Sequence, residues 1–432
     1  MLRDRWEVGR IKMFGERPDS GRAEKRESKG SGMITPDSIA QSFLCVAVLF
    51  GLQILTGCQT AQKETETYGG GHRKAEAPSA KEVKRAMDTT KSRADKDMAA
   101  VLAEFEDLKP KPLISLSAEE ARAQPTHADA VAALLQERKQ STAPMPIGKT
   151  KNQTIPGPGG AIPIRVYTPE GKGPFPVIVY FHGGGWVIAT IDTYDSSARA
   201  LAKATDAIVV SVEYRKAPEH KFPAAHEDAY AAYRWVLRNA DSFEGDPSMV
   251  AVAGESAGGN LAAAVCLMAR ARGELLPVYQ ALIYPIAGYD FNTSSYRENA
   301  NAKPLDKPMM AWFFEKYLRG PADGKHPWID LVNARNVIGL PPATIITAEI
   351  DPLRSEGKRY AERLLEAGVP VSYRNFKGVT HEFFGMGAVV GDAKKAVRLV
   401  ANGMNWSFDD PVFSRGDRLR SGPSVQIEPL QD

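Results

Sequence analysis

The sequence predicts an α/β fold with a mostly parallel central sheet, helices on both of its faces and a helical cap. From residue 162 onward, short β runs alternate with longer helical stretches, and such alternation favours a parallel sheet that is covered on both sides. The chain has 432 residues, 43% of them hydrophobic and 25% charged, which is typical of a globular protein. This composition excludes collagen-like, disulfide-scaffold and wholly disordered proteins.

The expected elements follow one another in a regular order. The β runs are 162–167, 177–181, 207–212, 249–253, 280–284, 344–347 and 371–376, and the helical stretches between most of them are 196–204, 224–240, 258–272, 353–367 and 393–404. About 60 residues separate the fifth run from the sixth, and they contain an aromatic helical piece over 309–318. A connection of that length indicates an inserted cap. Two further helical stretches, 97–108 and 118–140, precede the first β run.

Composition divides the chain into four parts. We expect a leader with a signal-like apolar segment over 1–57, a flexible linker over 58–95, an α/β domain over 96–405 and a loosely ordered tail over 406–432. The cap is expected from residues 96–145 and 286–340. The linker prediction rests on a surplus of Lys, Glu, Ala, Thr and Gly with little apolar periodicity.

Charge and cysteine usage narrow the classes of partner. The net charge is +3, and residues 1–32 carry nine Lys or Arg against six Asp or Glu, which is the whole excess. A basic face for nucleic acid therefore has no support. Three cysteines cannot build a disulfide framework, and they lack the clustering of metal ligands. Cys266, in an Ala-rich helical stretch, is expected to be a small buried hydrophobe.

The leader resembles a bacterial lipoprotein signal. The apolar run 43–55 is too short to span a bilayer, but its length suits the core of a secretory signal. It ends in Leu55-Thr56-Gly57-Cys58, which is similar to a lipobox and implies lipidation of Cys58, export and membrane attachment. The alternative is an unprocessed hydrophobic helix on a cytoplasmic protein, because the nearest positive residues lie upstream of Met33, a more natural start.

The strongest local motif is a candidate nucleophile turn. Residues 254–259 read Gly-Glu-Ser-Ala-Gly-Gly and fit G-x-S-x-G, between a short apolar run and an Ala-rich helical stretch. A turn this tight strains the backbone of Ser256 and holds its hydroxyl above the sheet. An incidental serine in a glycine-rich turn is the plainer alternative.

A serine nucleophile needs a base and an acid. Of the seven histidines, His381 alone follows the last β run in a loop, at the edge where Ser256 emerges; the others are His72, His127, His182, His220, His226 and His326. Asp351 follows the preceding β run at the same edge and can fix the tautomer of that histidine. Glu349 is the runner-up acid. The order Ser–Asp–His is that of α/β-hydrolases.

Glycines after the second β run can supply an oxyanion hole. Residues 182–186 read His-Gly-Gly-Gly-Trp, and bare backbone there lets N–H groups approach a substrate oxygen. Gly183, Gly184 and Ala257 would together provide three donors. A phosphate-binding loop is disfavoured because no Gly-Lys-Ser/Thr follows.

Four motifs as a set resemble the hormone-sensitive-lipase-like family of α/β-hydrolases. Besides the two glycine motifs, residues 213–225 read EYRKAPEHKFPAA and residues 351–357 read DPLRSEG. The resemblance covers roughly residues 100–405. It implies an α/β-hydrolase fold, hydrolysis of short- to medium-chain carboxylic esters, no metal or organic cofactor, and a cap from the N-terminal helices and the insertion after Tyr284. Glu382 departs from the glycine of many members, and Glu255 is an acidic variant within the pattern.

These residues predict a serine carboxylesterase that works through an acyl-enzyme on a small-molecule ester. A lipase or an amide deacetylase on the same triad is an alternative. A non-catalytic small-molecule receptor of the same fold is another, although such receptors lack the histidine that is present here as His381. Trp186 and Tyr289 either line the pocket or pack in the core. The oligomeric state is left open.

Overall fold

The structure is a computed structural model that describes residues 78–409. The apolar segment 43–55, Cys58 and the tail beyond Asp409 lie outside the described residues. Within residues 78–409, no helix is both long and apolar enough to cross a bilayer.

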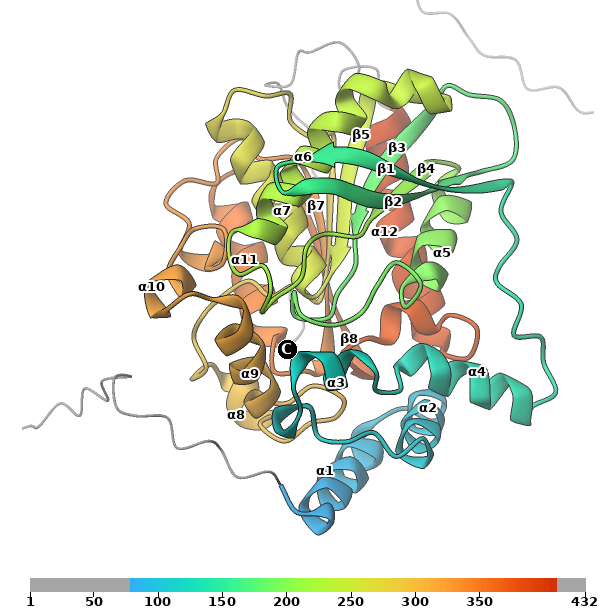
Figure 1. Cartoon of the computed structure of the whole chain (residues 1–432), viewed down its shortest axis with the longest axis vertical. Helices are drawn as coiled ribbons and strands as arrows, with labels where there is room; N and C mark the ends of the chain where they lie inside the picture. The colour runs from blue at the N-terminus through green and yellow to red at the C-terminus, as the bar shows by residue number, and fades with distance from the viewer. Residues whose placement is uncertain (1–77, 410–432) are drawn as a thin grey trace, which may run out of the picture. The chain divides into compact units, whose positions relative to one another are not determined.

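The described residues form an eight-stranded sheet in the order β1-β2-β4-β3-β5-β6-β7-β8 (Figure 1). Its strands are β1 (Lys149–Gly157), β2 (Gly160–Thr168), β3 (Phe175–Phe181), β4 (Ile208–Val212), β5 (Gly245–Glu255), β6 (Gln280–Ile283), β7 (Ala343–Ile350) and β8 (Val371–Thr380). β1 and β2 form an antiparallel hairpin, and β2 pairs with β4 in the antiparallel sense. All the remaining pairs are parallel, which confirms the mostly parallel sheet.

Helices cover both faces of this sheet. They are α1 (Ala80–Arg93), α2 (Lys96–Asp107), α3 (Ala118–Arg122), α4 (His127–Glu137), α5 (Asp195–Thr205), α6 (Ala224–Asn239), α7 (Ala257–Ala271), α8 (Ser294–Glu298), α9 (Lys307–Tyr317), α10 (Pro321–Gly324), α11 (Arg354–Glu366) and α12 (Gly391–Asp409). The five helices expected between and after the strands correspond to α5, α6, α7, α11 and α12. In Figure 1, α1 to α4 lie with α8 and α9 at one end of the sheet.

The central strands divide the core into two layers. Val177, Val179 and Phe181 of β3 belong to one buried cluster, which also contains apolar side chains of α6, α7 and α11. Ile178 and Tyr180 belong to a second cluster with side chains of α5 and α12. Successive side chains of a strand point to opposite faces, so an unbroken apolar run is what a strand buried on both faces needs.

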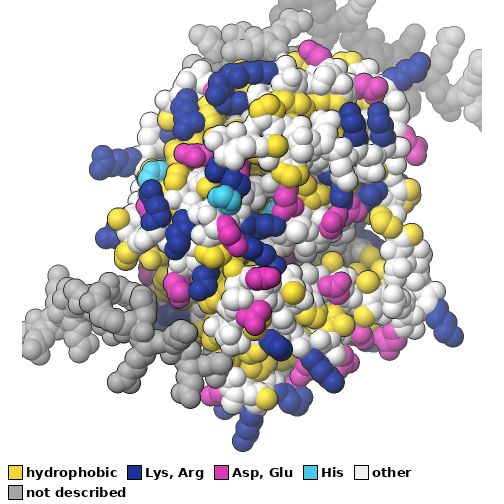
Figure 2. All heavy atoms as spheres, viewed as in Figure 1, with side chains coloured by type: hydrophobic (Ala, Val, Ile, Leu, Met, Phe, Trp, Pro, Cys, Tyr) yellow, Lys and Arg dark blue, Asp and Glu magenta, His cyan; other side chains and the backbone are white. Residues whose placement is uncertain are grey.

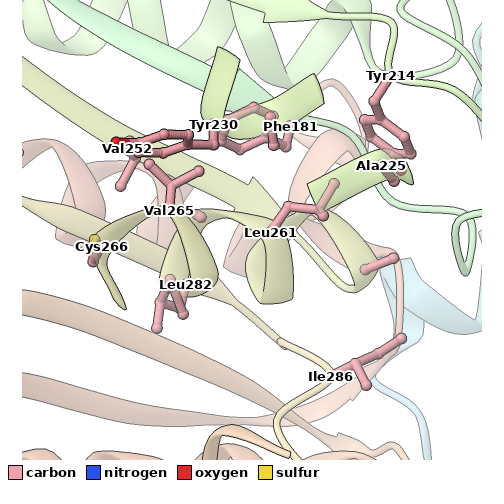
Figure 3. Close-up of a cluster of buried hydrophobic side chains, with 14 of the residues drawn as sticks. Phe181, Tyr214, Ala225, Tyr230, Val252, Leu261, Val265, Cys266, Leu282 and Ile286 are labelled. Carbon is pink, nitrogen blue, oxygen red and sulfur yellow. The ribbon is translucent and has the colours of Figure 1, made fainter. Parts of the chain in front are cut away.

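The helix after β5 is buried along most of its length. Figure 3 shows Val265 of α7 beside Val252 of β5, with Leu261 farther along the same helix, and all three are fully buried. Burying a side chain of this size stabilises the fold by roughly 2 kcal/mol. Cys266 lies on the same helix with 0% exposure and is a free thiol, as expected of a small core residue.

The structure differs from the sequence prediction at four places. β1 was not expected, because its sequence KTKNQTIPG lacks apolar alternation and its side chains are mostly exposed. The expected linker is wrong for residues 80–93, which form α1 behind a capping box of Ser79 and Glu82. The stretch 118–140 is two helices, since Pro125 interrupts it and Thr126 caps the second. The expected tail begins too early, because α12 continues to Asp409.

Charges are intermixed on the surface. Figure 2 shows basic and acidic side chains side by side over the face in view. Several of them form exposed pairs, such as Lys84 with Asp88 at 3.6 Å on α1. Such pairs contribute little to stability, so the fold depends on its two apolar layers.

Candidate active site

Ser256 stands in the tight turn between β5 and α7. β5 ends at Glu255 and α7 begins at Ala257, so the turn consists of this one residue. Its backbone has φ 55° and ψ −118°, a conformation that L-residues rarely adopt and that costs on the order of 1–3 kcal/mol. Its N–H donates to the carbonyl of Ile283 in the neighbouring strand at 2.9 Å. The packed sheet therefore stabilises this strained backbone conformation.

Two glycines make room for this turn. A Cβ on Gly254 would lie 2.1 Å from the carbonyl oxygen of Gly258, and one on Gly258 would lie 2.0 Å from that of Phe181. Both distances are far below van der Waals contact. Strand and helix thus approach so closely that the motif needs glycine at both positions.

Asp351 and His381 reach Ser256 from the loops after β7 and β8, which lie beyond β6 in the sheet. His381 Nε2 lies 2.9 Å from Ser256 Oγ, and His381 Nδ1 lies 2.7 Å from Asp351 Oδ2. All three side chains are buried, and Asp351 also accepts from the N–H of Leu353 at 2.8 Å. The structure brings together the three residues that the sequence singled out.

The electrostatics of this chain favour an imidazole that accepts a proton readily. Burial by itself lowers the pKa of His381, but the charge of Asp351 and its hydrogen bond outweigh this and raise the pKa above its ordinary value. The tautomer with hydrogen on Nδ1 donates to Asp351, so Nε2 is free to accept from Ser256. This is the state that a general base requires.

The runner-up acid and two of the other histidines are engaged elsewhere. Glu349, the runner-up acid, accepts from the N–H of Gly378 at 2.8 Å. His226 Nε2 lies 2.9 Å from Asn260 Oδ1, and His182 Nδ1 lies 2.8 Å from the carbonyl oxygen of the next residue. Burial lowers the pKa of each of these histidines to about 4.

The glycine loop leaves the sheet at the level of Ser256. Phe181 of β3 pairs with Gly254 of β5, so Gly183 and Ser256 each lie two residues beyond the same pair. Gly184 has φ 92°, and a Cβ there would lie 2.4 Å from the carbonyl oxygen of Ile188. The loop therefore carries bare backbone beside the serine, and the N–H of Ala257 lies at the start of α7, directly after it.

This geometry has close counterparts among known proteins. A family profile described as the alpha/beta hydrolase fold matches residues 178–385. Carboxylesterase NlhH of Mycobacterium tuberculosis is 45% identical over 239 residues, which are 54% of this chain and 75% of the relative. The chain belongs to the hormone-sensitive-lipase-like α/β-hydrolases.

Other members of this α/β-hydrolase family agree in sequence and in structure. The ethyl acetate hydrolase of Pseudomonas putida is 32% identical over 250 residues, covering 57% of this chain and 79% of the relative. The hyperthermophilic esterase of Pyrobaculum calidifontis has a TM-score of 0.64 and 38% identity, covering 71% of this chain and 96% of that one. A thermostable esterase from Pseudomonas putida ECU1011 has a TM-score of 0.65 and 32% identity, covering 73% and 98%.

A large cavity opens onto the triad of this hydrolase. Its volume is about 1050 Å³, and Ser256 and His381 lie on its floor. Apolar side chains of the N-terminal helices and α9 surround it: Val83, Met87, Phe105, Val131, Leu135, Met309, Met310 and Phe313. We call α1 to α4 together with α9 the cavity wall. Such a mostly apolar chamber suits a small organic ligand.

Trp186 and Tyr289 are packing residues. Trp186 is fully buried and stacks on Tyr317 with ring centroids 4.5 Å apart. Tyr289 packs edge-to-face on Phe314 at 5.0 Å. Neither belongs to the lining of the cavity.

Two acidic residues beside the triad form part of the site. Glu382 lines the cavity, and its two carboxylate oxygens lie 2.7 and 2.6 Å from Tyr194 Oη. Glu255 is fully buried and accepts from Tyr180 and Tyr284. Burial and the charge of Glu382 raise the pKa of Glu255 to about 7. The sequence marked both acids as variants of motif positions, whereas no pattern pointed to Tyr194.

Proposed function

We propose that this protein is a serine carboxylesterase that hydrolyses short- to medium-chain carboxylic esters through an acyl-enzyme. The observation that carries the proposal is the chain of contacts from Asp351 through His381 to Ser256, at 2.7 and 2.9 Å, on the floor of an apolar cavity. The esterase names of the relatives support the choice of ester over amide.

The proposed reaction proceeds in two halves. Ser256 Oγ attacks the ester carbonyl carbon while His381 Nε2 takes the hydroxyl proton, and the same nitrogen then gives that proton to the leaving alcohol oxygen. Water attacks the acyl-enzyme in the same manner, and the carboxylic acid leaves as Ser256 regains its proton. Asp351 holds the imidazole and stabilises its charged form. Each step uses groups of this chain, the substrate and water alone.

The N–H groups of Gly183, Gly184 and Ala257 are proposed to bind the oxyanion. Gly183 and Gly184 stand on backbone that has no room for side chains, and Ala257 directly follows the residue that attacks. Donors fixed before the reaction stabilise developing charge without reorganisation, and each contributes about 3 kcal/mol.

Replacing Ser256 by Ala tests the assignment. We expect hydrolysis of p-nitrophenyl acetate and butyrate to fall to background and labelling by a fluorophosphonate probe to disappear, because the nucleophile is lost. Ser248→Ala, on the same strand but away from the cavity, is the matched control and should keep both. Turnover retained in Ser256→Ala would refute the role of this residue, and a wild-type protein that neither reacts with the probe nor hydrolyses esters would indicate a receptor.

The pH profile tests the role of His381. The unprotonated imidazole is the active base, and its pKa is raised above the ordinary value of 6.5. Activity should therefore be full above that raised pKa and fall as the pH drops through it. Values of kcat/KM for p-nitrophenyl acetate, measured from about pH 5 to 9, should give an acid limb above 6.5; a limb near 4 would contradict this assignment.

We also propose that Cys58 is lipidated and attaches the exported enzyme to a bacterial membrane. The lipobox-like Leu55-Thr56-Gly57-Cys58 after an apolar run supports this. Labelled palmitate should be incorporated by the full chain and lost in Cys58→Ser. Incorporation that survives this substitution would overturn the proposal.

A further inference from the structure

Glu382 places a second carboxylate beside the histidine of the triad. Its Oε1 lies 3.8 Å from His381 Nε2, on the ring nitrogen opposite to the one that Asp351 contacts. The side chain is 22% exposed and lines the cavity. His381 therefore has a carboxylate near each ring nitrogen, one at 2.7 Å and one at 3.8 Å.

The backbone of Glu382 is in an unfavourable conformation for this residue type. Its φ is 73° and its ψ is 2°, which is the left-handed region. Glycine adopts this region without strain, whereas a residue with a side chain does not. A glutamate at such a position loses stability relative to glycine, and strained residues of this kind cluster at functional sites.

We propose that Glu382 is a positioning residue for protonated His381, stabilising the imidazolium while Tyr194 holds the carboxylate back from Nε2. This inference rests on the proposed esterase mechanism and deepens it. It adds no covalent step: the proton taken from Ser256 stays on Nε2 until it passes to the leaving oxygen.

The separation of 3.8 Å between Glu382 Oε1 and His381 Nε2 matters for this role. It is too long for a hydrogen bond, yet it is short for two opposite charges in a largely buried site. A carboxylate at hydrogen-bond distance would compete for the Nε2 proton and turn the ring away from Ser256. At the observed separation, Glu382 lowers the energy of the charged state without taking that hydrogen.

Tyr194 keeps this separation. Its hydroxyl donates between the two oxygens of Glu382, 2.7 and 2.6 Å away. Tyr194 is itself wedged against the glycine loop, because a Cβ on Gly183 would lie 2.2 Å from its Oη. The carboxylate is thus tied to a fixed ring and cannot swing toward His381.

Other groups also face His381, and they set the size of the expected effect. Asp351 comes from the loop after β7, Glu255 from the end of β5 and His127 from α4, while the ring of Tyr284 lies 4.6 Å from the imidazole. The acidic members of this set favour the imidazolium together with Glu382. Removing one charge should therefore shift the titration of His381 without abolishing activity.

The first test removes the charge and follows His381 directly. The rate of fluorophosphonate labelling of the full chain is measured against pH for wild type, Glu382→Gln and Glu382→Gly. The glycine variant is included because glycine adopts the backbone conformation of residue 382 without strain, so that this variant is expected to fold. We expect the acid limb of both variants to lie about one pH unit lower, and kcat for p-nitrophenyl butyrate to fall several-fold with little change in KM. Glu366→Gln, an exposed charge change on α11, should keep the wild-type limb. If the acid limb of the labelling rate lies at the same pH in wild type and in both Glu382 variants, the proposal is overturned.

The second test is a double-mutant cycle with the tyrosine. Tyr194→Phe frees the carboxylate, so we expect kcat to fall at least tenfold in the wild-type background and to change less than twofold when Glu382 is already Gln. A fall of equal size in both backgrounds would refute the restraint by Tyr194. Failure of the esterase mechanism itself looks different, because the wild-type protein would then not be labelled at all.

Discussion

The floor and the wall of the cavity are held in place by different kinds of contact. The floor consists of turns at the carboxyl edge of the sheet, where Gly254 and Gly258 have no room for a Cβ and His381 makes hydrogen bonds of 2.7 and 2.9 Å. The wall consists of amphipathic helices, whose apolar side chains face the cavity. We therefore expect small shifts on the floor to change the chemistry, and changes of shape in the wall to change which substrates fit.

Polar side chains connect the cavity wall to the loop that carries Asp351. We call these contacts the joint, and they are partly exposed. Arg93 at the end of α1 contacts Asn299 Oδ1 at 2.8 Å and Glu298 at 3.2 Å. Asn299 in turn donates to the backbone carbonyl of Asp351 at 3.1 Å. The wall therefore touches the triad loop through polar side chains, one of them exposed to water. The difference between the regions predicts large effects on chemistry from the floor, effects on specificity from the wall and small effects from the joint.

The largest effect is expected for Asp351→Asn on the floor. Asparagine keeps the shape but neither stabilises the imidazolium nor enforces the tautomer with hydrogen on Nδ1, so kcat should fall by about 10⁴-fold. The matched control is Glu349→Gln, two residues earlier, whose amide oxygen can still accept from Gly378. Steady-state kinetics with p-nitrophenyl butyrate measure both. A loss of similar size in the control would make Glu349 a member of the catalytic set.

An intermediate effect is expected for Leu135→Trp on the wall. Leu135 lines the cavity from α4, and the larger side chain fills the space that a long acyl chain would occupy. We expect kcat/KM to fall about tenfold for p-nitrophenyl octanoate, with acetate hydrolysis unchanged. Gln136→Trp, on the exposed side of the same helix, should leave both unchanged. A panel of esters from two to sixteen carbons would locate the cut-off, and an equal loss for all chain lengths would contradict the proposed division of roles.

The smallest effect is expected for Arg93→Ala at the joint. The pair with Glu298 is 32% and 46% exposed, so its loss should cost at most about 1 kcal/mol in the free energy of unfolding. Loss of the hydrogen bond to Asn299 should add about 1 kcal/mol. Urea denaturation measures this, and kcat should stay within about twofold. A larger fall in kcat with normal stability would show that the joint transmits strain to Asp351.

Patterns close together in the sequence were sufficient to predict the floor. A G-x-S-x-G segment, a triple glycine and two residues after successive strands are local signals, and parallel strands bring their carboxyl ends to the same edge. The buried strands could be predicted equally well, since a run such as 177–181 is apolar throughout. β1 could not be predicted, because its stability comes from nine paired positions along β2 and not from its own side chains.

The N-terminal helices show where local reading could have gone further. The capping boxes of Ser79 with Glu82 and of Thr126 with Asp129 are sequence signals. Pro125 is a breaker in front of the second. Read together, they would have placed α1 in the supposed linker and divided the stretch 118–140.

The sequence by itself predicted the fold class and singled out Ser256, Asp351 and His381 at one edge of the sheet, because these predictions follow from short-range periodicity and turn chemistry. The tertiary structure alone decided what surrounds them. The contact of Glu382 with Tyr194 joins residues 188 positions apart, and the cavity combines α1 with α9 across more than half of the described chain. Such contacts between residues far apart in the sequence depend on how helices, strands and loops pack against one another, and no local sequence pattern predicts them.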